Sequence, residues 1–159
     1  MPDIMWTAPP DIRQDYNDNC WAAVLEAFCA AAPGRPKVKQ KPITDQFSNL
    51  CFGENDGTMT RRGMFTMFKD VRFGLKSMEV APEAFTPLLL SQKLGYGHVI
   101  LGFWEKRIHG WHVGLAYGIK GNDVSYLNPD CEWGGLCKTP IDTFRTPGVG
   151  NLVVAWRAW

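Results

Sequence analysis

The segment QDYNDNCWAA, residues 14–23, is the place where a polar loop passes into an apolar run. That run continues as CWAAVLEAFCAAA over residues 20–32, which are good helix formers with a bulky apolar side chain every three or four positions. Asp18 or Asn19 can cap the start of this helix, and the PGRP segment that follows ends it. The sequence therefore predicts a helix with Cys20 in its first turn.

A cysteine in the first turn of a helix has a distinctive electrostatic environment. Its thiol faces unpaired backbone N–H groups and the positive end of the helix dipole, and both favour the thiolate. Cys20 is therefore a candidate nucleophile. Taken alone, a cysteine at such a position is more often a small buried side chain, so the assignment depends on further residues.

The other cysteines do not indicate a metal site. The chain has five, an odd number with no C-x-x-C spacing, namely Cys20, Cys29, Cys51, Cys131 and Cys137. This pattern argues against structural zinc. A loop disulfide between Cys131 and Cys137 and a reduced chain with buried thiols both stay open.

The remaining chain divides into a helical part and a strand-rich part. Further helices are predicted at residues 42–52, capped by Thr44, at residues 60–71, opening after Thr60, and at residues 82–95, ended by Gly95. Short β-branched and aromatic runs follow at residues 98–104, 111–119, 123–129 and 151–159. These runs predict an antiparallel sheet built mostly from hairpins. The expected fold class is α+β, with an N-terminal helical half that carries Cys20 and a C-terminal sheet.

Composition limits the kinds of partner. The chain has 159 residues, 45% of them hydrophobic, which suits one domain over residues 1–159. A net charge of +1 offers no field of one sign for nucleic acid or an anionic membrane surface. Apolar stretches such as HVILGFW are far shorter than the roughly 20 residues that a membrane helix needs. The N-terminus has no continuous apolar segment, so we expect no signal peptide on this chain.

A cysteine nucleophile needs a base, and the chain has three histidines. His112 opens the run HVGLAYGI after a GWH turn, so its side chain can project from a strand end over a helix terminus. His98 precedes a more apolar run and His109 lies in the charged turn EKRIHG, so they rank second and third. If the strands around KGND form a hairpin, Asn128 and Asp130 lie beside the start of the His112 strand and can orient its imidazole.

With these residues the chain resembles the papain-like cysteine peptidases, in particular their compact C39-like branch and related bacterial effector proteases. Gln14 lies six positions before Cys20, the offset at which that family has a donor to its oxyanion hole. His112 and Asn128 are sixteen positions apart, and Asn128 directly precedes Pro129, as in the family pattern. The local signature DNCWAA differs from the CGSCW of plant and lysosomal members.

The resemblance implies acyl transfer on a papain-like fold. Cys20 would attack a scissile carbonyl, His112 would take and return the proton, and Asn128 would fix the imidazole tautomer. Gln14 and the backbone N–H of Cys20 would receive the oxyanion. Asp130 is the alternative third member of the triad, because its charge is the better partner for an imidazolium. This chemistry needs no metal and no cofactor.

Three tryptophans are candidates for a substrate cleft. Trp21 follows the candidate nucleophile, and Trp111 and Trp133 lie in predicted turns near the site. Packing in the core is the more ordinary role for such side chains.

The resemblance also implies a protein or peptide substrate. The small size and the lack of a recognisable propeptide resemble a toxin or effector domain that a specialised bacterial secretion system delivers into a target cell, with a cognate immunity protein as partner. An amidase, deamidase or transglutaminase using the same triad is the main alternative. A catalytically silent binding module is the third, and the presence of Gln14, Cys20 and His112 together argues against it.

Overall fold

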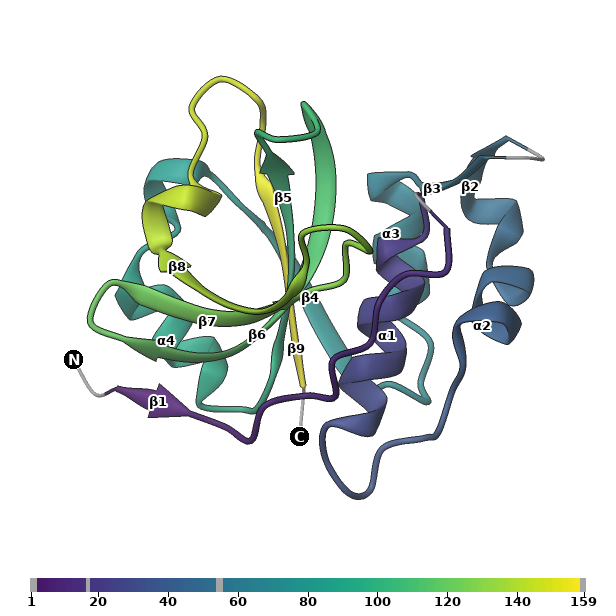
Figure 1. The fold of residues 1–159 in the computed structure, drawn as a ribbon, viewed down its shortest axis with the longest axis horizontal. Coiled ribbons are helices and arrows are strands. Elements are labelled where there is room, and N and C mark those ends of the chain that lie inside the picture. Colours follow the sequence, from purple (N-terminus) through teal and green to yellow (C-terminus); the bar gives the residue numbers. More distant parts are fainter. Residues whose placement is uncertain (1–2, 17, 54–55, 158–159) are drawn as a thin grey trace.

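The protein is a twisted sheet with helices on both faces (Figure 1). The computed structural model describes residues 3–16, 18–53 and 56–157. The α-helices of these ranges are α1 (Cys20–Ala30), α2 (Gln40–Gln46), α3 (Arg61–Phe68) and α4 (Pro87–Leu94). Helices α1 and α3 lie against one face of the sheet with α2 outside them, and α4 lies on the other face.

The sheet is antiparallel throughout its described pairs. Its main strands are β4 (Leu75–Val80), β5 (Val99–Glu105), β6 (Gly110–Lys120), β7 (Asp123–Asn128), β8 (Gly135–Pro140) and β9 (Leu152–Arg157). Their spatial order is β4-β9-β5-β6-β7-β8, and the short β1 (Ile4–Met5) also pairs with β6. Strands β5 to β8 are consecutive hairpins, whereas β9 returns to pair with both β4 and β5.

Smaller elements connect these parts. A second, two-stranded sheet consists of β2 (Cys51–Gly53) and β3 (Asp56–Met59). Short 3-10 turns cover Ser48–Leu50, Pro82–Ala84 and Ile141–Phe144.

The core has one part on each face of the sheet. Along β5 the side chains alternate, so that Ile100 packs toward α1 and α3, whereas Leu101 and Phe103 pack toward α4. Each fully buried Leu, Ile or Phe side chain contributes roughly 1.5 to 3 kcal/mol to folding. Helix α1 is buried from Trp21 to Cys29, because it lies between the sheet and α2, and this explains its almost wholly apolar sequence.

The prediction for the first helix is confirmed at its start. Helix α1 begins at Cys20 and ends at Ala30, two residues before the predicted end. Asn19 occupies the N-cap position, but its Oδ1 accepts the backbone N–H of Tyr16 at 3.0 Å, and no side-chain bond reaches the helix. Asn19 is therefore the N-cap residue, as predicted, but its carboxamide shapes the preceding loop instead of bonding to the helix.

The prediction of a helix at residues 42–52 with Thr44 as cap is wrong. Helix α2 begins at Gln40, and the Thr44 hydroxyl donates to the Gln40 carbonyl at 2.9 Å inside the helix. A 3-10 turn and strand β2 follow. By contrast α3 starts as predicted, since the Thr60 hydroxyl accepts the backbone N–H of Gly63 at 2.8 Å.

The predicted helix at residues 82–95 is divided in two. A 3-10 turn at Pro82–Ala84 is followed by α4, which opens at Pro87 after its own N-cap, Thr86. The Thr86 hydroxyl accepts the backbone N–H of Leu89 at 3.2 Å. Gly95 follows the last helical residue, as predicted.

The four predicted strands exist as β5, β6, β7 and β9, and the α+β class is confirmed. The predictions did not include β4 or β8, which are the two ends of the sheet order. Strand β4 lies in the half that the sequence predicted to be helical. The last two residues of the predicted strand 151–159 lie outside the described residues.

Candidate active site

Cys20 lies where the start of α1 meets β6. The two elements pack against each other, and the backbone N–H of Val113 is within hydrogen-bonding reach of the Cys20 sulfur. Val113 is the residue after His112. Helix α1 and strand β6 thus bring positions that are far apart in the sequence to one place.

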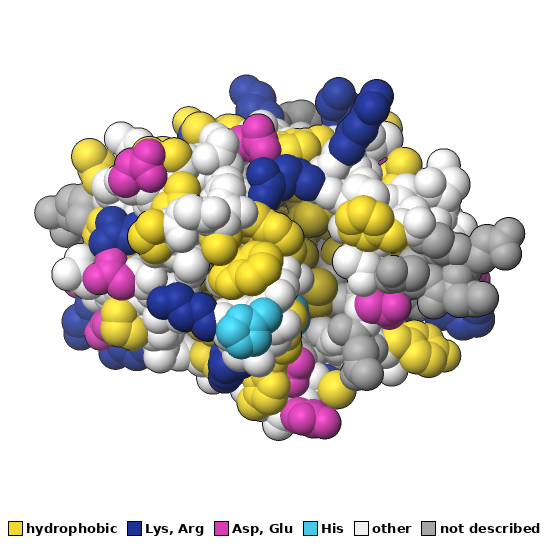
Figure 2. Space-filling view, turned by 90° about the horizontal axis from the view of Figure 1, so that it is seen from above, with side chains coloured by type: hydrophobic (Ala, Val, Ile, Leu, Met, Phe, Trp, Pro, Cys, Tyr) yellow, Lys and Arg dark blue, Asp and Glu magenta, His cyan; other side chains and the backbone are white. Residues whose placement is uncertain are grey.

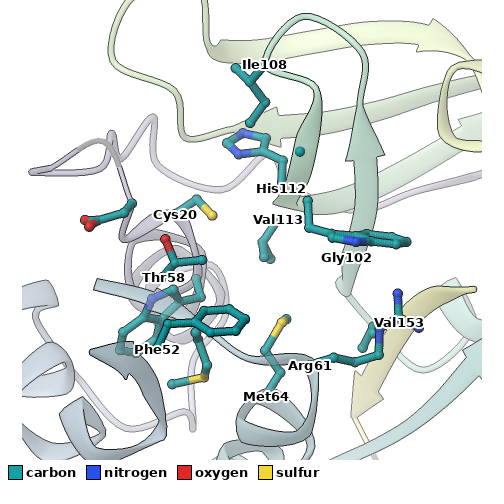
Figure 3. Close-up of a pocket in the computed structure, with 15 residues that line it drawn as sticks. Cys20, Phe52, Thr58, Arg61, Met64, Gly102, Ile108, His112, Val113 and Val153 are labelled. Carbon is teal, nitrogen blue, oxygen red and sulfur yellow. The ribbon is translucent and has the colours of Figure 1, made fainter. Parts of the chain in front are cut away.

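A cavity of about 550 Å³ opens beside Cys20. Figure 2 shows hydrophobic side chains gathered around a hollow on this face of the molecule. Its lining combines both predicted reactive residues with largely apolar neighbours: Asp18, Cys20, Trp21, Phe52, Thr58, Met59, Arg61, Met64, Gly102, Ile108, Gly110, Trp111, His112, Val113 and Val153. In Figure 3 the Cys20 thiol and the His112 imidazole point into the same space at one end of this cavity.

The tautomer of His112 follows from its neighbours. Asn128 Oδ1 accepts the backbone N–H of Asp130 at 3.0 Å, which fixes the orientation of the carboxamide. The same oxygen lies 2.7 Å from His112 Nε2. Because an amide oxygen can only accept, Nε2 carries the hydrogen and Nδ1 carries the lone pair. The imidazole is therefore oriented to accept a proton at Nδ1.

Aromatic rings surround the pair of His112 and Asn128. The ring centroids of His112 and Trp133 are 5.9 Å apart, and those of His112 and Phe103 are also 5.9 Å apart. His112 is 3% exposed and Asn128 is fully buried. Exclusion of water strengthens the hydrogen bond between them, because competing partners are removed.

The protonation state of Cys20 differs from the sequence-based expectation. Burial raises the pKa of the Cys20 thiol to about 11, and hydrogen bonding from the backbone of Val113, Trp21 and Cys20 itself acts in the opposite direction. The helix start was expected to favour the thiolate, and that expectation is wrong for the free site. Loss of hydration outweighs the helix terminus, so the resting thiol is neutral.

The pKa of His112 shifts in the complementary direction. Burial lowers the pKa of His112, while the hydrogen bond to Asn128 and the charges of Glu105 and Asp130 raise it and that of Arg107 lowers it. Burial thus favours the neutral form of both side chains, the thiol and the imidazole.

Gln14 does not line the cavity, but it contacts Pro129, the residue that follows Asn128. Its backbone N–H donates to the Pro129 carbonyl at 2.8 Å, and its side-chain Nε2 donates to the Tyr16 carbonyl at 2.8 Å. Gln40 holds this loop from the other side, because its side chain donates to the Arg13 carbonyl at 2.7 Å and accepts from the Asp15 N–H at 3.0 Å. The predicted oxyanion role of Gln14 stays a prediction.

Asp130 has a different place from the one predicted for an alternative triad member. Its Oδ1 accepts the backbone N–H of Glu132 at 2.8 Å and of Trp133 at 3.1 Å. Asp130 therefore shapes the loop that carries Trp133, and Asn128 holds the hydrogen bond to His112.

The three candidate cleft tryptophans occupy different positions. Trp21 is 2% exposed and lines the cavity from α1, and Trp111 is 39% exposed at its rim. The Arg61 guanidinium lies 4.5 Å above the Trp111 ring. Trp133 does not line the cavity, because it packs on His112 instead.

The other two histidines do not contribute to the lining of this cavity, although His109 lies between two residues that do, Ile108 and Gly110. His98 is buried at the start of β5, where it contacts Thr7 and Arg35. His109 is exposed in the turn between β5 and β6, with a positive φ of 48°. Neither lines the cavity that holds Cys20.

Several residues of the site had no sequence signal. Met59, Met64 and Val153 form the apolar lining, but they come from β3, α3 and β9. Glu105 and Arg107 lie near His112 and form an ion pair, with Nε and Oε1 3.0 Å apart. The acid-x-Arg spacing EKR could have indicated this pair, but nothing in the sequence places it beside the imidazole.

Within the described residues, the five cysteines are free thiols, so the Cys131 to Cys137 disulfide is not formed. In the same part of the chain, no group of three or more His, Cys, Asp or Glu side chains is arranged to hold a metal ion. No described helix combines the length and apolarity needed to cross a membrane.

Comparisons with known proteins identify the fold. No protein-family model matches the chain, and no curated protein matches its sequence. The peptidase domain of Streptococcus ComA, a bi-functional ABC transporter involved in quorum sensing, is 14% identical with a TM-score of 0.65, over 92% of this chain and 96% of that one. A double glycine motif protease from an AMS/PCAT transporter, solved in complex with the leader peptide, is 17% identical with a TM-score of 0.57, over 98% of this chain and 97% of that one.

A third solved structure, from Bacillus anthracis and described as a C39-like peptidase, is 11% identical with a TM-score of 0.60, over 99% of this chain and 98% of that one. The protein thus has the papain-like fold of C39 peptidase domains along almost its whole length. The predicted fold is confirmed. At these identities the likeness extends to architecture, and activity has to be argued from the site.

Proposed function

We propose that the protein is a cysteine peptidase that hydrolyses peptide bonds of a protein or peptide substrate. One observation carries the proposal. His112 has one ring nitrogen held by Asn128 at 2.7 Å, and its other nitrogen carries a lone pair in the cavity that Cys20 lines. A purely structural role for a buried histidine does not account for a second ring nitrogen that lies in an open cavity together with a thiol.

The chemistry follows from the two neutral groups. The Cys20 thiol gives its proton to Nδ1 of His112 while the sulfur attacks the scissile carbonyl carbon. The imidazolium then protonates the leaving amine, which departs as the C–N bond breaks and leaves a thioester on Cys20. Water, deprotonated by His112, hydrolyses the thioester and restores the thiol. Asn128 keeps the imidazole in the reactive tautomer throughout.

The cavity points to a peptide segment with apolar side chains. Its lining is mostly Met, Trp, Phe, Ile and Val, and an apolar wall of this kind gains free energy by covering apolar substrate surface. One of the structural neighbours is a double glycine motif protease that was solved in complex with the leader peptide. Peptides with and without such a motif are therefore the first substrates to compare.

The toxin or effector role and a cognate immunity protein stay predictions. No contact among the described residues supports an immunity partner, and the structural neighbours include two peptidases from transporters.

The test compares the wild-type protein with Cys20→Ala in a cell lysate and identifies new peptide N-termini by mass spectrometry. We expect cleavages that vanish in Cys20→Ala and persist in Cys131→Ala, because Cys131 is an exposed thiol outside the cavity. Both variants remove one sulfur, so the second controls for loss of a thiol elsewhere.

Other outcomes would assign another reaction. Mass shifts of glutamine to glutamate that depend on Cys20 would indicate a deamidase, and incorporation of amines would indicate a transglutaminase. Labelling of Cys20 by an epoxide thiol trap without any of these products would indicate a narrow amidase. Absence of both products and labelling would indicate a binding module.

A further inference from the structure

Glu105 is a buried carboxylate at the end of β5. It is 4% exposed and lies opposite Gly110 in the register of β5 and β6. Arg107 pairs with it through three hydrogen bonds, from the backbone N at 3.1 Å, from Nε at 3.0 Å and from Nη2 at 3.3 Å. A buried carboxylate is costly to desolvate even when it is paired, so folding stability alone does not account for this ion pair.

Arg107 connects this carboxylate to the active site through Trp133. Its guanidinium lies 3.7 Å from the centroid of the Trp133 ring, and the Trp133 ring packs against His112 with centroids 5.9 Å apart. The backbone N–H of Trp133 is also bonded to Asp130. The indole is thus held by a cation on its ring and by a hydrogen bond on its backbone, in contact with the imidazole.

The charges around His112 connect the ion pair of Glu105 and Arg107 to the reaction. Asn128 is neutral, so it orients the imidazole without offering a countercharge when the ring becomes an imidazolium. The charged groups that act on the imidazole are Glu105, Asp130 and Arg107. The titratable groups that line the cavity with it are Cys20, Asp18 and Arg61. Of the two acids, Asp130 accepts the backbone N–H groups of Glu132 and Trp133, whereas Glu105 accepts from the backbone and the side chain of Arg107.

We propose that Glu105 and Arg107 are positioning residues of the active site, which hold the Trp133 indole against His112 and place a buried negative charge where the imidazolium forms. The proposal rests on the proposed peptidase function. Neither residue touches the reacting atoms, and both act through His112. Glu105 favours the protonated imidazole, and the Arg107 to Trp133 stack keeps water from the bond between His112 and Asn128.

The chain contains a matched control for this pair. Asp70 and Arg72 have the same spacing and the same three bonds, from the backbone N at 3.0 Å, from Nε at 3.0 Å and from Nη2 at 2.8 Å. The Arg72 guanidinium lies 5.1 Å from the ring centroid of Phe73. This pair follows α3 and does not act on His112.

The first test measures the pKa of His112 directly by NMR titration of the imidazole in a Cys20→Ala background, which needs no activity. Glu105→Gln should lower the pKa of His112, because the anion that favours the imidazolium is gone. Arg107→Gln should raise it, because a cation is gone. Asp70→Asn and Arg72→Gln should leave it unchanged. Equal pKa values of His112 in all five proteins would overturn the proposal, whether or not the protein is a peptidase.

The second test is the pH profile of kcat/KM with a cleaved peptide. Its acid limb should move to lower pH in Glu105→Gln and to higher pH in Arg107→Gln, and the plateau of kcat/KM should fall on the order of tenfold to a hundredfold in both. Arg107→Lys keeps the charge without the planar stack, so its acid limb should stay near the wild-type position while its plateau falls. A uniform loss of activity without displacement of the limb would reduce the pair to a structural role and contradict the proposal.

Discussion

His98 and His112 are both buried, both close to an end of a strand of the same β5–β6 hairpin, and differ in what their ring nitrogens face. His98 uses both nitrogens in the protein interior, with Nε2 2.8 Å from the Thr7 carbonyl and Nδ1 3.3 Å from Arg35 Nη1. His112 uses Nε2 on Asn128 and leaves Nδ1 for the cavity. Burial lowers the pKa of both rings.

The comparison shows that burial and a lowered pKa do not by themselves make a base. Thr7 and Arg35 are hydrogen-bond partners of the two ring nitrogens of neutral His98, so neither nitrogen is available to accept a proton from a substrate. The surroundings of His112 satisfy one side of the ring only, and the other side lies in the cavity that Cys20 lines. The open nitrogen is the feature that separates the two residues.

The largest expected effect on kcat/KM comes from replacing His112 or His98, one at a time, with an uncharged side chain. His112→Gln should lower kcat/KM by roughly 10⁴-fold to 10⁶-fold, because the base is lost. His98→Gln should leave kcat/KM within a few-fold of wild type and lower the free energy of unfolding by about 1 to 3 kcal/mol, because buried partners lose their bonds. Peptide cleavage and urea unfolding of both variants measure these effects. A large loss of kcat/KM in His98→Gln together with nearly unchanged kcat/KM in His112→Gln would contradict the account.

A smaller effect on activity is expected when the hydrogen-bond partner of each imidazole is replaced. Asn128→Ala should reduce kcat by about 10²-fold to 10⁴-fold with little change in KM, because the imidazole loses its fixed tautomer. Arg35→Met should change stability and not kcat, since Arg35 bonds to His98 and to the Phe28 carbonyl at 2.7 Å. Steady-state kinetics at one pH measure kcat of both variants, and urea unfolding measures their stability. Equal effects on kcat would remove the distinction between the two histidines.

The smallest expected effect is on the pH dependence of stability. Because the folded pKa of His98 lies below its ordinary value of 6.5, the unfolded chain binds the proton more readily than the folded protein does. Stability is therefore complete above pH 6.5 and is lost progressively as the pH falls from 6.5 to the folded pKa. Urea unfolding between pH 5 and pH 8 should show a shallower dependence in His98→Gln than in wild type. An identical slope would show that His98 titrates alike in both states.

The sequence predicted well where structure follows from local pattern. The apolar run after Cys20, the caps at Thr60 and Gly95 and the hairpin strands depend on residues close in the chain, and these elements are present. The order of Cys20, His112 and Asn128 also led to residues that the structure brings together, although their catalytic roles stay proposals.

The sequence failed where distant parts determine the outcome. Strands β4 and β8 are edge strands with half-exposed side chains, so they lack a strong apolar pattern, and β4 pairs with β9 near the other end of the chain. The raised pKa of Cys20 is likewise a tertiary effect. Helix position alone favours the thiolate, and only the packed structure shows how far hydration of the sulfur is lost.

The central claim is that Cys20 becomes reactive only by giving its proton to His112. The most direct measurement is the rate of Cys20 alkylation by iodoacetamide between pH 5 and pH 11, by peptide mass spectrometry, in wild type and in His112→Gln, with the other four cysteines as references in the same sample. In wild type, alkylation of Cys20 should rise as His112 becomes neutral and exceed that of the reference thiols near pH 7. In His112→Gln it should vanish at neutral pH and return only as the pH approaches about 11, the pKa that burial gives the isolated thiol. Identical profiles in the two proteins would contradict the account.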